Sequence, residues 1–354
     1  YTWQEPDEKT LSFQREHSAS LRISIVVPAY QTKKEHLEAM LNSVSRQSYP
    51  HWELIVADAG GTAESVQAWA KKNGICLREA ADASNLAEWK DQSIVLCTLS
   101  ENKGISANTN AGIELAAGDA VGLLDHDDLL TANALWEMAD CLEKEKKRGK
   151  QKLVLFSDED KCDGAASRFY EPNFKPDFDG ELLLTNNYIC HFTVIETAFL
   201  KELKLRSGFD GAQDYDLMLR VYAAGGQFVH VPKVLYHWRC HEASTASNPQ
   251  SKRYAYEAGQ RALEDYCLRK GWKATVSGLK HLGFYREDYE DSVFCQRPEI
   301  GIWAKPLPGG RDILGIRHPK GFLVSGLYEN DGSMRYAGLR KGYSGPMHRA
   351  ALQQ

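Results

Sequence analysis

Several motifs and runs that would decide the class of this protein are missing from its sequence. No run of apolar residues reaches the roughly 18 residues of a membrane-spanning helix, and no signal peptide opens the chain. The eight cysteines are scattered without a CxxC pair, and several lie in apolar runs such as IVLC and NYIC. This usage is typical of reduced, buried thiols in an intracellular protein.

Phosphate-binding loops and nucleophile motifs are absent too. The chain contains neither GxxxxGK[ST] nor GxGxxG, so P-loop and dinucleotide interpretations lack their phosphate cradle. No GxSxG marks a hydrolase nucleophile. The 43 basic residues against 48 acidic ones leave a formal charge of -5. Because that balance lacks the basic surface of a nucleic-acid-binding protein, we expect no nucleic-acid partner.

The patterns that are present favour a large α/β domain. With 354 residues, 43% of them hydrophobic, the chain can bury a sizeable core. From Arg22 onward, short apolar runs such as RISIVVP, ELIVAD, AVGLLD and LVLFSDED alternate with helical stretches. This alternation predicts a mostly parallel central sheet. In residues 33–47, one helical face collects Leu37, Met40, Leu41 and Val44.

Three segments differ in composition. Residues 1–20 are polar and lack clear periodicity, so we interpret them as a leader or linker. Residues 21–280 hold the α/β pattern. Residues 281–354 contain short apolar runs split by Gly and Pro, which predicts a β-rich extension or the start of a further domain. The chain begins at Tyr1 rather than at a methionine, and we expect it to be a piece of a longer polypeptide.

Acidic residues stand where several predicted strands end. Asp58, Asp125 and Asp158 each close a buried run, and open α/β sheets bind ligands outside the carboxyl ends of their strands. For any one of them a helix cap explains the residue equally well. In LLDHDDLL, Asp125 and Asp127 project to one side of an extended chain. Such a pair suits a divalent ion that bridges phosphate oxygens, whereas the alternative is a turn with Asp128 as the cap.

A second acidic pair opens a predicted helix. The segment GFDGAQDYDLMLR places Asp214 and Asp216 in its first turn. Asp216 can satisfy the helix dipole and the free N–H groups there, which leaves Asp214 to face a cleft. Two simple caps are an equal alternative. In HWRCH, zinc binding by His237 and its neighbours lacks a matching cysteine pair, so we do not expect a structural zinc site.

In this order, these pieces resemble the family 2 glycosyltransferases, the inverting nucleotide-sugar enzymes with a GT-A fold. The resemblance runs from about Ile23 to about Arg269, roughly three quarters of the chain. It is strongest to bacterial members that build O-antigen or rhamnose-rich surface polysaccharides. The segments that carry it are VVPAY, LIVADAG, ENKGISANTNAG, AAGDAVGLLDHDDLL, LVLFSDEDK, FKPDF, NNYICHF, GAQDYDLMLR and VLYHWRCHEASTA.

The resemblance implies a donor site at the strand ends. Asp58 is similar to the acid that accepts the N3–H of uracil or thymine, although this chain reads DAGG where the family more usually has a second acid and a serine. The residues that match donor-binding positions are Pro28, Ala29, Tyr30, Asp58, Lys103, Gly104, Asp125, Arg239 and Ser244.

The resemblance also implies a metal site, a base and an acceptor side. Asp125 and Asp127 match the DxD motif, and His237 falls where some members add a third ligand to Mn²⁺ or Mg²⁺. Asp214 matches the catalytic base. The acceptor side corresponds to Asp158, Glu159, Asn187 and His191.

The expected function is therefore metal-dependent, inverting transfer of a sugar from a UDP- or dTDP-linked donor to a saccharide hydroxyl. The resemblance implies an oligosaccharide or lipid-linked glycan acceptor and further transferase domains in the same polypeptide. It also implies a cytoplasmic position at the inner face of the bacterial membrane, by peripheral association.

Two other classes remain open. One is a non-catalytic sugar- or nucleotide-binding module of a multi-domain transferase, which donor hydrolysis or transfer by the isolated chain would exclude. The other is a nucleotidyltransferase, which would release pyrophosphate instead of a nucleoside diphosphate.

Overall fold

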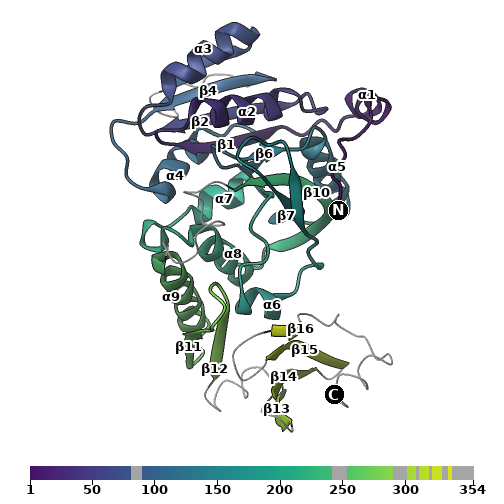
Figure 1. Cartoon of the computed structure of the whole chain (residues 1–354), viewed down its shortest axis with the longest axis vertical. Coiled ribbons are helices and arrows are strands. Elements are labelled where there is room, and N and C mark those ends of the chain that lie inside the picture. The colour runs from purple at the N-terminus through teal and green to yellow at the C-terminus, as the bar shows by residue number, and fades with distance from the viewer. Residues whose placement is uncertain are drawn as a thin grey trace. The chain divides into compact units, whose positions relative to one another are not determined.

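The computed structural model describes residues 1–80, 90–240 and 253–289, and the backbone of four strands between residues 301 and 336. Its contacts divide the chain into two compact units. The larger unit comprises Tyr1–Phe178 and Ile189–Ala258, and the smaller comprises Asp179–Tyr188 and Gly259–Gln354. Figure 1 labels the helices and strands of both units.

A ten-stranded sheet forms the centre of the larger unit as far as the structure describes it. Pairing is parallel from β3 to β5 and between β7 and β10, while β9 runs antiparallel to both β5 and β7. In spatial order the strands are β3 (Cys76–Ala80), β4 (Ser93–Thr98), β2 (Trp52–Asp58), β1 (Ile23–Ala29), β5 (Ala120–Leu123), β9 (Thr193–Glu196), β7 (Leu153–Cys162), β10 (Gln227–Arg239) and β6 (Leu129–Leu130), with β8 (Phe169–Asn173) paired to β7. The α/β prediction with a mostly parallel central sheet is confirmed.

Helices cover both faces of the central strands (Figure 1). In this unit they are α1 (Glu8–Glu16), α2 (Lys34–Ser45), α3 (Ala63–Asn73), α4 (Ile105–Leu115), α5 (Ala134–Lys147), α7 (Thr197–Leu203) and α8 (Gln213–Ala223). The core cluster that contains the buried residues of α2 also contains Ile25, Val27 and Val56 of the sheet. Helix α4 packs on the alternate residues, because a Cβ on its Gly112 would lie 2.7 Å from Cγ1 of Val26. Side chains alternate along a strand, so α4 lies on the opposite face from α2.

The packing of α2 follows the periodicity of its sequence. Leu37, Met40, Leu41 and Val44 are all buried, which confirms that they share one helical face. Of the strands beneath them, β2 is buried along its whole length and β1 at every residue except Pro28, because both faces are covered.

The first twenty residues contain an ordered helix. In α1, the side chain of Asp7 accepts a hydrogen bond from the Thr10 N–H at 2.8 Å and so caps the helix. Gln14, the buried residue of α1, donates to Glu137 in α5 and accepts from Ser48. The segment that the sequence interpretation places in a leader or linker is therefore fixed to the larger unit by buried polar contacts.

The smaller unit is mainly β structure after a short helix, α6 (Gly180–Thr185). Helix α9 (Arg253–Arg269) crosses the division between the units. An antiparallel hairpin follows, made of β11 (Ala274–Gly278) and β12 (Tyr285–Tyr289). The last described strands form an antiparallel sheet of β13 (Gly301–Leu307), β14 (Arg311–His318), β15 (Gly321–Tyr328) and β16 (Met334–Tyr336). A β-rich C-terminal extension is thus confirmed. Among the described helices, none combines the length and the apolar character needed to cross a membrane.

Candidate active site

The acidic turn lies between two strands of the sheet. β5 ends at Leu123, and β6 begins at Leu129, so Asp125, Asp127 and Asp128 occupy the connection at the carboxyl end of β5. The N–H of Asp128 donates to the carbonyl of Asp125 at 3.3 Å, which closes the turn. Such a position beyond the strand ends is where open α/β sheets bind ligands.

A cluster of three possible metal ligands forms at this turn. One ligand atom from each of Asp125, Asp128 and His191 lies within 4.8 Å of the others, within the part of the chain that the structure describes. His191 comes from the connection that precedes β9, so two segments distant in sequence supply the group. Carboxylate oxygens with one imidazole suit Mn²⁺ and other divalent ions. The sequence expectation included Asp125 but not Asp128 or His191 as ligands.

Asp128 does not cap the next helix, which is the alternative that the sequence leaves open. Helix α5 begins six residues later, with Asn133 at its N-cap. The buried Asp128 carboxylate instead accepts hydrogen bonds from the Tyr236 hydroxyl and from the Arg239 backbone N–H, the latter at 2.7 Å. Both donors lie on β10, the strand that pairs with β6 directly after the acidic turn.

The carboxylates of this turn are buried close together, so their negative charges repel one another. Burial raises the pKa of the Asp128 carboxyl well above its usual range, and the charges of Asp127 and Asp125 raise it further. Burial also raises the pKa of Asp125, while His191 opposes the shift. A divalent cation would offset this repulsion, so the residues present fit such an ion.

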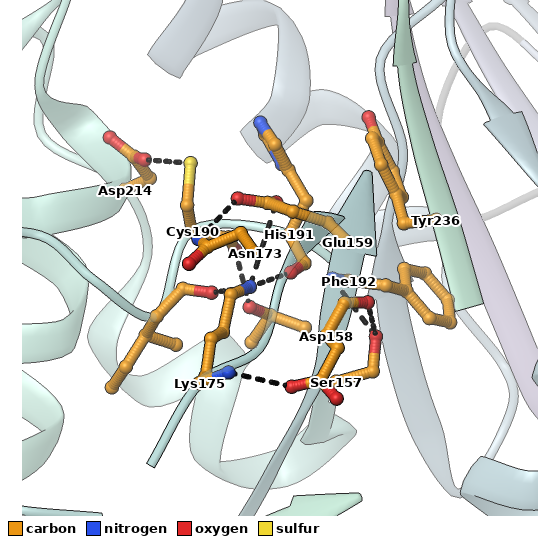
Figure 2. A network of polar contacts seen from close by, with 12 residues as sticks. Ser157, Asp158, Glu159, Asn173, Lys175, Cys190, His191, Phe192, Asp214 and Tyr236 are labelled. Carbon is orange, nitrogen blue, oxygen red and sulfur yellow. Dashed lines mark hydrogen bonds and ion pairs between the residues drawn. The ribbon is translucent and has the colours of Figure 1, made fainter. Parts of the chain in front are cut away.

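Asp214 lies on the same cavity as Asp125. This cavity of about 70 Å³ is lined by both carboxylates and by Pro28, Cys190 and His191. Asp214 is in the first turn of α8, and the Cys190 thiol donates to its Oδ2 at 3.6 Å (Figure 2). Burial, followed by the Asp214 charge, raises the pKa of the Cys190 thiol well above its usual range. The thiol therefore stays protonated and serves as a donor.

Asp216 has a structural environment, although it follows Asp214 by only two residues. It is 1% exposed and forms ion pairs with Arg206 and Arg220, whose Nε lies 2.9 Å from Oδ2 of Asp216. Arg220 also donates to the carbonyls of Leu203 and Lys204. These contacts fix α8 against the preceding segment and leave Asp214 at the cavity.

His237 is directed away from the acidic turn. Its Nδ1 bonds to Asp160, and its ring packs edge-on against Trp3 at 5.0 Å. The adjacent Tyr236 stacks on His191 with ring centroids 4.7 Å apart. Neighbouring residues of a strand point to opposite faces, so Tyr236 and His237 cannot both face the cluster.

Arg239 contacts the backbone of the acidic turn. Its guanidinium donates to the carbonyl oxygens of Asp127 and Gly164. Nη2 of Arg239 is buried without a hydrogen-bond partner among the described residues. Ser244, the other predicted phosphate neighbour, lies outside the described residues.

On the donor side, Asp58 acts as a helix cap. Its carboxylate accepts hydrogen bonds from the backbone N–H groups of Gly60, Thr62 and Ala63, at 3.0, 3.3 and 2.8 Å. Ala29 is buried, and the Tyr30 side chain is exposed. A contact of Asp58 with a nucleobase stays a prediction.

Gly104 and Lys103 stand at the start of α4. Gly104 has a φ of +94°, and a Cβ there would lie 2.4 Å from Oδ2 of Asp210. Asp210 in turn accepts the N–H of Ser106 in the first turn of α4 at 3.3 Å. Lys103 is exposed, with its ammonium 3.1 Å from Glu101. The glycine thus lets a carboxylate approach the helix terminus.

Three of the four predicted acceptor residues lie in the larger unit, where they have different partners. Asp158 and Glu159 are neighbours on β7, but Asp158 bonds to His230, whereas Glu159 accepts from Asn173 at 3.2 Å. His191 belongs to the acidic cluster instead. Asn187 is half-buried and lies in the smaller unit.

Lys175 is a site residue that sequence reasoning did not single out, although it stands in the FKPDF segment. Its side chain is 1% exposed, and its ammonium donates to the carbonyls of Ile189 and His191, at 2.6 Å to the former (Figure 2). The contacts join residue 175 to a segment more than ten residues later, so no local pattern marks them.

Two known proteins are similar to most of this chain in sequence. An uncharacterized protein, y4gI of Sinorhizobium fredii, is 36% identical over 255 residues, which cover 71% of this chain and 26% of y4gI. The O-antigen biosynthesis protein RfbC of Myxococcus xanthus is 34% identical over 256 residues, 72% of this chain and 19% of RfbC. The chain therefore spans about a quarter to a fifth of the length of these two relatives.

A solved structure shares the fold. The S. aureus TarS 1-349 structure in complex with UDP-GlcNAc superposes with a TM-score of 0.51 at 19% identity, over 70% of this chain and 67% of that one. The family model described as glycosyl transferase family 2 matches residues 24–203, from β1 to the end of α7. That match covers just over half of the 354 residues, and the chain belongs to glycosyl transferase family 2.

Proposed function

We propose that this chain is the catalytic unit of a metal-dependent, inverting glycosyltransferase of bacterial surface-polysaccharide synthesis. It would move a sugar from a UDP- or dTDP-linked donor to a saccharide hydroxyl. The observation that carries the proposal is that Asp125, His191 and Asp214 line one cavity. A candidate cation site and a candidate base on the same cavity support this activity.

Asp125, Asp128 and His191 would hold the divalent cation, Mn²⁺ or Mg²⁺, with Asp127 in the same turn as a further candidate. When bound, a divalent ion neutralises the charge that develops on a nucleoside diphosphate leaving group. The chain's own part is to present the ligands. Tyr236 and Arg239 hold Asp128 by hydrogen bonds, so the turn is organised before a donor arrives.

Asp214 would accept the proton of the attacking hydroxyl. The family match ends at residue 203, so this role depends on the geometry: a carboxylate on the cavity, two residues from a buried acid that fixes the helix. General-base catalysis by a positioned carboxylate typically contributes about 10²- to 10⁴-fold. A single base opposite the leaving group gives one displacement and therefore inversion at the anomeric carbon.

The relatives support a proposal for the setting of the reaction. RfbC is named an O-antigen biosynthesis protein and is several times longer than this chain. We propose an oligosaccharide or lipid-linked glycan acceptor, further transferase domains in the same polypeptide, and a cytoplasmic position at the inner face of the membrane. The UDP-GlcNAc complex of TarS supports a uridine donor as the first to test.

Transfer and donor hydrolysis by this chain, with UDP- and dTDP-sugars and either Mn²⁺ or Mg²⁺, test the proposal. We expect Asp214→Asn to lower turnover about 10²- to 10⁴-fold while donor affinity changes less than about threefold. Asp125→Asn should abolish cation-dependent binding of UDP. Asp140→Asn is the control, because this half-buried acid of α5 pairs with Lys144 and does not line the cavity. Near-normal turnover by Asp214→Asn would show that the base assignment is wrong, and binding without any turnover by the unaltered chain would favour a non-catalytic module.

A further inference from the structure

The connection between Cys190 and His191 supplies both halves of the candidate site. The Cys190 thiol donates to Asp214, and the His191 ring belongs to the cluster with Asp125 and Asp128. These two adjacent residues lie in an irregular segment before β9. Some other part of the molecule must therefore hold this segment in place.

The backbone carbonyls of the segment have defined donors. The Cys190 carbonyl accepts from the Thr193 hydroxyl at 2.7 Å, and the Phe192 carbonyl accepts from the Ser157 N–H at 3.1 Å. The carbonyls of Ile189 and His191 both accept from the ammonium of Lys175. One buried cation thus binds the backbone on either side of Cys190.

Lys175 is itself firmly anchored. Its backbone N–H donates to Oδ1 of Asp158 at 2.8 Å, which ties it to β7. Its ammonium lies 3.5 Å from Oε2 of Glu159, and Asn173 holds the other oxygen of that carboxylate. A buried ammonium needs such a counter-charge and such acceptors to be stable. Figure 2 shows this arrangement beneath the Cys190–His191 segment.

We propose that Lys175 is a positioning residue. It fixes the position of the base, Asp214, relative to the candidate cation ligands of the site. The inference rests on the proposed transferase function. Lys175 touches neither the cavity nor the reacting atoms: it acts through the two carbonyls that flank Cys190. Its removal should turn the thiol from Asp214 and the imidazole from the acidic turn, because both side chains share the released backbone.

The expected effect is on turnover more than on donor affinity. A misplacement of about 1 Å costs on the order of 10²-fold in rate. We therefore expect Lys175→Met to lower kcat about 10²-fold, to change the KM for the donor nucleotide-sugar less than about threefold, and to weaken Mn²⁺ binding about tenfold. Lys175→Arg, which retains the charge and several donors, should recover part of kcat.

Lys201 provides a matched control. It also donates to two backbone carbonyls, of Glu114 and Ala116 at the end of α4, at 3.0 and 2.9 Å. Lys201→Met removes the same kind of tether away from the cavity. We expect it to leave kcat and Mn²⁺ affinity within about twofold of the unaltered chain.

Two measurements separate the inference from the function on which it rests. Mn²⁺ binding is measured by calorimetry, and the alkylation rate of Cys190 is followed by peptide mass spectrometry. Lys175→Met should accelerate Cys190 alkylation at least about tenfold, because the thiol loses its fixed position, while Lys201→Met should not.

If the unaltered chain binds Mn²⁺ but transfers no sugar, the function fails while alkylation still tests the tether. If Lys175→Met matches Lys201→Met in kcat, Mn²⁺ affinity and alkylation, the positioning role is refuted. Should Lys175→Met not fold, Lys175→Gln takes its place, because its shorter, uncharged amide cannot replace the ammonium between both carbonyls. Values equal to those of Lys201→Met would then refute the role.

Discussion

Asp214 and Asp216 share one turn of α8, yet the structure predicts opposite results when each is replaced by asparagine. Asp216 is 1% exposed and bonds two guanidinium groups. Removing one partner of a buried ion pair costs about 3–5 kcal/mol, since the remaining charges lose their counter-charge. Arg206 is 28% exposed and can be partly solvated, whereas Arg220 is 8% exposed and cannot. We therefore expect a loss of about 3 kcal/mol for Asp216→Asn.

Asp214→Asn should change the stability by less than about 1 kcal/mol, because this half-buried side chain lines a cavity. Its effect should fall on turnover. Urea unfolding followed by tryptophan fluorescence gives both stability changes, with Asp140→Asn, which removes one partner of a partly exposed ion pair, as the control. A loss of less than about 1 kcal/mol in the free energy of unfolding for Asp216→Asn would refute its anchoring role. Equal losses for both variants would refute the assignment of a structural role to Asp216 and a catalytic role to Asp214.

Three further results follow from the geometry. His191→Ala should weaken Mn²⁺ binding about 10- to 100-fold by calorimetry, while His237→Ala should leave it within about twofold, since His237 bonds Asp160 on the other face. The reverse order would favour His237, as the sequence predicts, over His191 as the ligand. Gly104→Ala should lower stability by about 2 kcal/mol or more in urea, because φ is +94° and the Cβ would meet Asp210. Gln14→Ala should cost about 1–3 kcal/mol through its two lost hydrogen bonds, and no loss would show that α1 is not fixed by them.

The sheet and its helices are largely predictable because their signals are local. A run such as RISIVVP is apolar and β-branched along its length, and β1 is buried on both faces accordingly. The face of α2 follows from spacing alone. By contrast, α1 is polar, and Gln14 is the buried residue among its nine, so the helix leaves no apolar periodicity to detect.

The acidic turn was predictable as a place, but the set of candidate ligands that the structure brings together there was not. Asp125 and the turn at a strand end follow from LLDHDDLL. The partners of Asp128 come from Tyr236 and Arg239, more than a hundred residues away. His191 likewise enters from another connection. Contacts of that kind depend on strand order, which the sequence pattern does not specify.

The alternation of side chains along β7 and β10 explains which neighbouring residues share the site. On β10, Tyr236 contacts Asp128 and His191, so its neighbour His237 must face the opposite side, where Asp160 receives it. On β7, Glu159 points toward Lys175, so the next residue, Asp160, points to the opposite face of the sheet, the same face as His237. The period of two therefore places a histidine next to a site without placing it in the site. A sequence motif of adjacent residues does not say which of them points toward the site and which points away. The geometry of the strand supplies that information.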